Sequence, residues 1–309
     1  MAILNSLLES IMSFGLPGAV SQGIIWGIMA IGVYITFKIL DIADLTVDGS
    51  FATGGAVLVV CVTQYNLNVW IALLIAFIAG CIAGFATGMF HTKFGIPAIL
   101  SGILTQFALY SINLRILGGA NLALNVRKYS VLLTGHNPVS ALITSAIFAA
   151  VLIGLLYCFM GTQLGQSLRA TGCNPNMSRA NGINTERNKV LGLIISNGVV
   201  ALSGGLLAQY QGFADVNMGR GAIVIGLAAV IIGEVLFSRI YRNLAVRFTS
   251  AIVGGILYYI IITFVLRMGL RADDLKLLTA LVVAVFLGIP YWKKSIMETR
   301  TKKGVKKDA

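Results

Sequence analysis

The segment AIVIGLAAVII, residues 222–232, is apolar at every position. A strand of a membrane β-barrel would alternate apolar with polar side chains, so an unbroken run of this kind is typical of a membrane-spanning helix. Similar runs recur along the chain, and most are long enough to cross about 30 Å of hydrocarbon at about 1.5 Å per residue. Breakers divide them into nine candidate spans, near residues 18–37, 51–63, 69–90, 97–117, 138–160, 190–211, 221–237, 250–266 and 274–290.

This pattern predicts an all-α polytopic membrane protein with about eight to ten transmembrane helices. The composition agrees with it. Of the 309 residues, 57% are hydrophobic and 11% are charged, and the mean hydropathy is +0.89. These values exclude a soluble enzyme. We treat residues 1–290 as a single transmembrane domain and residues 291–309 as a basic tail.

The formal net charge of +12 comes from Lys and Arg residues in loops and in the tail, where seven of them lie within 293–307. Because basic loops stay in the cytoplasm, we expect the tail, the C-terminus and the loops at 161–190 and 238–249 there, in a multi-pass plasma or inner membrane protein. No basic stripe with interleaved aromatic residues suggests nucleic acid as a partner, so the expected surroundings are the lipid bilayer. The same rule puts the acidic segment 41–50 on the cytoplasmic side, but one span more or fewer would move it, and its side and depth stay open.

Residues for catalysis or metal binding are not grouped in the sequence. No GxxxxGK[ST] motif occurs, and the histidines and cysteines lack a spacing suited to metal ligands. We therefore expect no metal site, no catalytic residues and no ATPase site in this chain, which disfavours a membrane-embedded enzyme. The string LSGGL at 202–206 and the glycines at positions 80, 84 and 88 lie inside apolar spans, where small residues predict close packing of helices.

The polar loop GQSLRATGCNPNMSRANGINTERNK, residues 165–189, is the most informative segment outside the spans. A break at Asn174-Pro175 predicts two short helices, at 166–171 and 176–181, with the second ended by Gly182. Short helices lying along the membrane face can dock into the groove of a partner. An ordinary solvated basic loop is the alternative, and the residues alone leave both interpretations open.

This loop, taken as residues 161–189, resembles the cytoplasmic coupling segment of the permease subunits of ABC importers of the branched-chain amino acid and ribose type. The segment DLTVDGSF at 44–51, followed by Gly-Gly-Ala, is similar to the start of a core helix in that family, with Asp48 as an additional residue. Residues 221–234 resemble a late core helix, with Glu234 where Gly is common. The resemblance covers most of 18–290. The coupling residues that it implies are Leu168, Arg169, Ala170, Thr171, Gly172, Asn174, Met177, Ala180, Gly182 and Ile183.

The resemblance implies a transport subunit rather than an enzyme: the permease of an ATP-driven importer. Its implied partners are a cytoplasmic ATP-binding subunit that binds ATP and Mg²⁺, a second permease copy, either identical in a homodimer or a paralogue, and an extracytoplasmic substrate-binding protein. No cofactor is expected in this chain itself. A largely apolar pathway favours a zwitterionic or hydrophobic solute, such as a branched-chain or aromatic amino acid, over a highly charged one. The identity of the solute stays open.

Segments 44–55 and 215–226 share their first and last residues and a Gly-containing turn, which suggests an inverted repeat, although chance explains so short a match equally well. Irregular backbone at membrane depth must be buried in protein or line a cavity. Polar groups inside spans, Gln106 and Asn113 among them, are costly in lipid and must face protein or water. The predicted pathway residues are Asp44, Asp48, Gly49, Gly54, Asn197, Asp215 and Glu234.

An ion-coupled secondary transporter is the alternative function, because broken helices and inverted repeats also occur in that class. It would need an ion site inside the membrane. Glu234 together with Asp44 or Asp48 is the set of carboxylates that this alternative would use.

Overall fold

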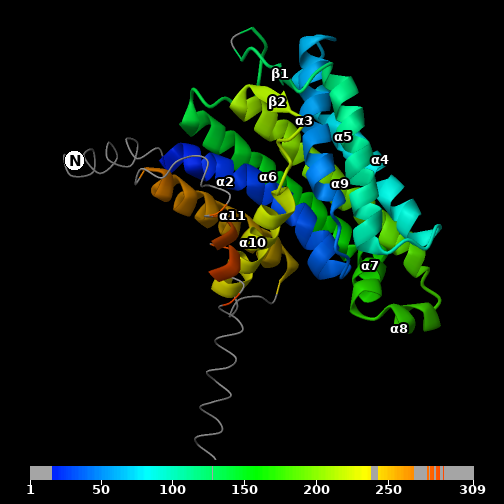
Figure 1. Cartoon of the computed structure of the whole chain (residues 1–309). Coiled ribbons are helices and arrows are strands. Elements are labelled where there is room, and N and C mark those ends of the chain that lie inside the picture. The colour runs from blue at the N-terminus through cyan, green and yellow to red at the C-terminus, as the bar shows by residue number, and fades with distance from the viewer. Residues whose placement is uncertain are drawn as a thin grey trace, which may run out of the picture.

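The computed structural model describes residues 16–126, 128–237 and 243–267, and further along the chain residues 277, 279–281, 283–285 and 288. Helices dominate this part of the chain, with one short pair of antiparallel strands (Figure 1). The elements in chain order are α2 (Leu16–Tyr34), the π-helix η1 (Ile35–Ile39), α3 (Thr46–Thr63), α4 (Val69–Thr92), α5 (Ala98–Leu117), β1 (Asn121–Ala123), α6 (Pro138–Gly161), α7 (Gln163–Cys173), α8 (Pro175–Ala180), α9 (Thr185–Gln211), β2 (Phe213–Asp215), α10 (Ala222–Phe237) and α11 (Leu244–Arg267).

Seven helices in the described ranges are long and apolar enough to cross a membrane, and α10 is a shorter apolar helix. The all-α polytopic fold is therefore confirmed. These eight helices correspond to the first eight predicted spans. The ninth, 274–290, lies largely outside the described residues, as does the basic tail at 291–309.

Helix α9 lies in the middle of the bundle and packs against α2, α3 and α4. Most of α2, α3 and α9 is buried, whereas α4, α5, α6 and α11 present much of their surface outward. Helices α7 and α8 lie at the opposite end of the molecule from the β1–β2 pair (Figure 1). The bundle thus has two distinct ends, one with the short helices and one with the strands.

Helices α3 and α9 approach each other so closely that side chains are excluded at the contact. A Cβ atom at Gly54 would collide with the carbonyl of Ala201, and one at Gly204 would collide with the carbonyl of Phe51. Helix α4 uses its glycine stripe in the same way, because Gly80 and Gly84 rest on backbone carbonyls of α9. The packing role predicted for the LSGGL string and for this stripe is confirmed.

Helices α3 and α10 both begin inside the bundle. The chain leaves η1, passes through an irregular segment at 40–45 and starts α3 beside Asn197, near the middle of the 27-residue helix α9. Helix α10 starts next to Asp48 in the first turn of α3. From there α3 runs toward the strand end, where Tyr129 donates to the Thr63 carbonyl, and α10 runs toward η1, where Glu234 meets Lys38. This arrangement agrees with an inverted pair of segments, and the repeat itself stays a hypothesis.

The α3–α9 contact predicts how two matched glycines respond to the same change. Gly54→Ala places a methyl group against the Ala201 carbonyl, and overpacking of this kind costs about 1–3 kcal/mol or more. Gly154, on the exposed face of α6, has no atom within 4 Å of the position of a Cβ. We expect Gly54→Ala to lower the melting temperature in detergent and Gly154→Ala to keep or raise it, because alanine is favoured over glycine inside a helix. Equal melting temperatures for the two variants would contradict the packing described here.

Candidate functional site

Two carboxylates, one helical turn apart, accept hydrogen bonds from the starts of two different helices. Asp44 Oδ1 accepts from the Thr46 amide at the start of α3, at 2.9 Å. Asp48 accepts from the Gly221 and Ile223 amides at the start of α10, each at 2.9 Å. The segment 44–48 therefore caps both helices.

These caps provide acceptors for backbone amides that would otherwise be unpaired. The first amides of any helix have no partner within the helix, and an unpaired amide in a bilayer interior costs several kcal/mol because no water is available. The helix dipole adds a positive potential at the same point, which favours a carboxylate there. Irregular backbone is tolerated between these helices because Asp44 and Asp48 accept hydrogen bonds from the amides at the starts of α3 and α10.

Asp44 also belongs to a buried network that joins α3 to α9. Asn197 donates through Nδ2 to Asp44 Oδ2 at 2.7 Å and to the Leu193 carbonyl at 3.0 Å. The Ser50 hydroxyl donates to Asn197 Oδ1 at 2.6 Å. Asn197 is fully buried and each of its side-chain polar atoms is bonded. Its position is that of a structural residue between helices.

A cavity of about 330 Å³ lies beside Asp48, between α3, α5 and the segment that leads into α10. Its polar lining combines a carboxylate, two amides and a guanidinium, and its aromatic lining comes from two side chains of α5. These residues are at the middle of α5, so the cavity lies midway along that helix, on a side of the bundle where Phe107, Tyr110 and Arg220 are exposed. The lining residues are Asp48, Gly49, Gln106, Phe107, Tyr110, Asn113, Val216 and Arg220.

Two of the seven predicted pathway residues, Asp48 and Gly49, border this cavity. Asp44 borders a different cavity of about 310 Å³, whose lining is apolar and includes Ile99 and Leu227. Gly54 lies in the α3–α9 contact. The pathway assignment for all seven stays a prediction, but the structure does not bring the set together.

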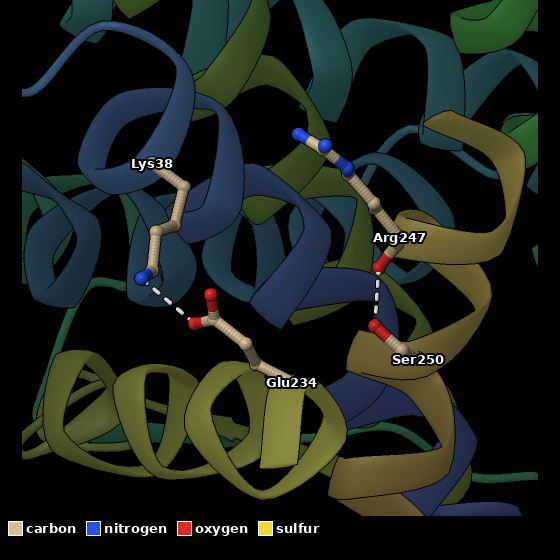
Figure 2. A network of polar contacts seen from close by, with 4 residues as sticks. All are labelled: Lys38, Glu234, Arg247 and Ser250. Carbon is tan, nitrogen blue, oxygen red and sulfur yellow. Dashed lines mark hydrogen bonds and ion pairs between the residues drawn. The ribbon is translucent and has the colours of Figure 1, made fainter. Parts of the chain in front are cut away.

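The remaining predicted residues lie at the two ends of the bundle. Asp215 Oδ1 accepts from the Asn217 amide at 2.6 Å in the turn after β2. Glu234 points from α10 toward η1 and pairs with Lys38 at 2.7 Å, with both side chains about one-third exposed (Figure 2). No group of three or more His, Cys, Asp or Glu residues among those described is placed to hold a metal ion.

The cavity residues that sequence reasoning did not choose follow a recognisable spacing on α5. Gln106, Tyr110 and Asn113 are at positions i, i+4 and i+7 of one helix, which puts them on one face. Two of them are amides in an apolar span, and that was the available signal. The sequence around Arg220 carries no such signal. Arg220 lies beside the cavity because the next residue, Gly221, donates to Asp48, which is far away in the sequence.

The loop at 161–189 forms two short helices, α7 and α8, as predicted. Asn174 separates them, and its side chain accepts from the Met177 amide at 3.0 Å to cap α8. The predicted coupling residues divide into two groups. Leu168 and Thr171 are buried, Ala170, Gly172 and Ile183 are partly buried, and the exposed group consists of Arg169, Asn174, Met177, Ala180 and Gly182.

Three of these residues, Thr171, Gly172 and Arg169, attach α7 to the bundle. Asn188 on α9 donates to the Thr171 hydroxyl at 2.9 Å. A Cβ at Gly172 would collide with the Ile39 carbonyl at the end of η1. The Arg169 guanidinium donates to the Met160 carbonyl of α6 at 3.3 Å. Helix α7 thus contacts α6, α9 and η1.

Comparisons with known proteins cover nearly the whole chain. A family model described as branched-chain amino acid transport system, permease component, matches residues 16–290. The tyrosine transport system permease protein of Clostridioides difficile is 41% identical over 93% of this chain and 95% of its own length. An uncharacterized protein of Rickettsia prowazekii is 36% identical over 87% and 95%, respectively. A Methanocaldococcus jannaschii protein named "Probable branched-chain amino acid transport permease protein LivH" is 23% identical over 90% and 93%. No solved structure matches the chain.

The double cap predicts a difference between two acidic residues of the same segment. Asp48→Asn keeps one acceptor oxygen and turns an amide toward the second backbone donor, so it should cost about 1–3 kcal/mol of folding free energy. Asp41→Asn removes the same charge from an exposed position and should change stability by less than about 0.5 kcal/mol. Thermal unfolding of the purified variants in detergent measures both. If the two variants unfolded at the same temperature, Asp48 would not be the cap that the structure shows.

Proposed function

The chain belongs to the family of branched-chain amino acid transport system permease components, and we propose that it is the transmembrane subunit of an ATP-driven importer of an amino acid. The family assignment makes it a multi-pass transport component. The observation that carries the proposal is the mechanical attachment of α7, because an importer driven from outside the membrane needs a rigid element that transmits displacement to the spans.

We assign the exposed face of α7 and α8 as the docking surface for a cytoplasmic ATP-binding subunit, which binds ATP and Mg²⁺. Met177 is 63% exposed on a short helix that has little apolar surface otherwise, and such a side chain is suited to insertion into a partner's groove. This assignment puts the α7–α8 end in the cytoplasm, the side on which the basic tail and the C-terminus are proposed to lie. The strand end then faces the extracytoplasmic substrate-binding protein.

A second permease copy, identical or paralogous, is proposed to cover the outward face of α5. Tyr110 and Arg220 are exposed there at the depth of the Asp48 cavity, and a guanidinium facing lipid is costly. The outward faces of α4 and α6 are different. They carry apolar stripes suited to lipid, which consist of Ile71, Leu74, Ile78, Ile82 and Phe85 on α4 and Val139, Ile143, Ile147, Val151 and Leu155 on α6.

The amino acid as solute is supported by the names of two relatives. The Clostridioides difficile relative is a tyrosine transport permease, and the Methanocaldococcus jannaschii relative is named for branched-chain amino acids. The cavity at Asp48 agrees with such a solute, because it offers a carboxylate and a guanidinium on one small volume. The ion-coupled alternative depended on Glu234, and the pairing of that carboxylate with Lys38 gives it no support.

The proposed docking surface is tested by charge placed at one exposed position. Met177→Glu should leave the melting temperature unchanged and reduce the amount of ATP-binding subunit that copurifies with the tagged chain at least tenfold, which corresponds to about 1.4 kcal/mol or more. Tyr65→Glu is the matched control, since Tyr65 is exposed to a similar degree, 69%, in the turn between α3 and α4 at the other end of the bundle. Mass spectrometry of the copurified subunits measures the ratio. Equal recovery of the subunit with both variants would remove α8 from the interface.

A further inference from the structure

We infer that the cavity between α3, α5 and residues 216–220 is a transit site that binds an aromatic amino acid as a zwitterion. The inference rests on the proposed function and adds to it the place of binding and the class of solute. Five side chains carry the argument: Asp48, Phe107, Tyr110, Asn113 and Arg220.

Asn113 is the first observation, because its amide is buried without a partner. The side chain is 1% exposed, and neither Nδ2 nor Oδ1 has a hydrogen-bond partner within the described part of the chain. A buried polar group left unpaired costs about 1–3 kcal/mol, so such groups are rare in folded proteins. Asn113 is one of the residues that line the cavity, and a small rotation of its buried amide would let a bound solute supply the missing partners.

The contrast with Asn197 shows that burial alone does not explain why the Asn113 amide lacks hydrogen-bond partners. Both residues are asparagines inside spans, and both are almost fully buried. Asn197 has three hydrogen bonds, to Asp44, Ser50 and Leu193. Asn113 has a cavity in the place of such partners.

The charges of the lining select a zwitterion. The Asp48 carboxylate borders the cavity from α3, and the Arg220 guanidinium borders it from the segment before α10. Among the described residues, no carboxylate lies within 4 Å of the Arg220 guanidinium, so this cation is available to a ligand. An amino acid carries an ammonium group for Asp48 and a carboxylate for Arg220, whereas a neutral sugar carries neither.

The aromatic side chains of the lining favour an amino acid whose own side chain is aromatic. Tyr110 lies under the Arg220 guanidinium, 5.8 Å from Cζ to the ring centre, so the cation is held over an aromatic face. Phe107, one turn earlier on α5, is 71% exposed at the mouth of the cavity. An aromatic ring stacks on such faces with a gain of about 0.5–1.5 kcal/mol beyond the burial of its area. The volume of about 330 Å³ suits one small molecule, since ligand sites in proteins occupy about 300–1,000 Å³.

The experiment uses the importer isolated by tagging the full chain in its own host and reconstituted in liposomes with the subunits that copurify. The uptake probes are radiolabelled L-tyrosine, L-leucine and D-ribose, each measured with and without ATP. Asn113→Leu is the central variant, and Asn197→Leu is its matched control. The melting temperature of each variant is measured in parallel.

We expect Asn113→Leu to keep or raise the melting temperature, because it replaces an unpaired buried amide with an apolar group of similar size. Its ATP-dependent uptake of tyrosine should fall at least tenfold. Asn197→Leu should lower the melting temperature, because it leaves Asp44 and Ser50 without their partner. Tyr110→Leu should reduce uptake of tyrosine at least fivefold more than uptake of leucine.

Three results would overturn the inference while the proposed function stands: wild-type uptake of tyrosine by Asn113→Leu, a fall in its melting temperature that matches the loss of uptake, or ATP-dependent uptake of leucine in preference to tyrosine. Preferential uptake of ribose would overturn both the inference and the amino acid as solute. A different result would overturn the proposed function instead. That result is a wild-type preparation that contains no ATP-binding subunit and takes up none of the three probes in response to ATP.

Discussion

The structure depends on one constraint: two helices begin inside the bundle rather than at its ends, so their first amides need acceptors from the protein. Asp44 accepts from the start of α3, and Asp48 accepts from the start of α10, so a single five-residue segment satisfies both. With those acceptors in place, the irregular backbone at 40–45 and the turns at 216–221 can lie inside the bundle. Without them, both helices would have to begin at the membrane surface.

The same two carboxylates determine what surrounds them. Asp44 is bonded to Asn197, which in turn fixes Ser50, and this network holds α3 against α9 where glycines bring the backbones together. Asp48 borders the polar cavity, and Arg220 follows because it immediately precedes the first residue that Asp48 caps. The two carboxylates, Asn197 and the polar cavity thus lie together beside the starts of α3 and α10.

Much of the fold was predictable from local signals, and most of the site was not. Apolar runs gave the spans, Asn174-Pro175 gave the break between α7 and α8, and the glycine stripes gave the close contacts. These features depend on residues near one another in the sequence. The contact between Asp48 and Gly221 joins residues 173 positions apart, and no local pattern encodes it. For the same reason the sequence did not distinguish Asn113 from Asn197, because their difference lies in what packs around them.

The separation between Asp48 and the helix that it caps also orders the events of synthesis. The chain is made from its N-terminus, so the acceptor is present long before residues 221–223 leave the ribosome. When residues 221–223 are made, Asp48 and the sequences of α3 and α9 have already been synthesised. Had the carboxylate been downstream of α10, the nascent protein would have had to hold unpaired amides in lipid until the partner was translated. Asp48 is thus translated before the helix whose first amides it caps.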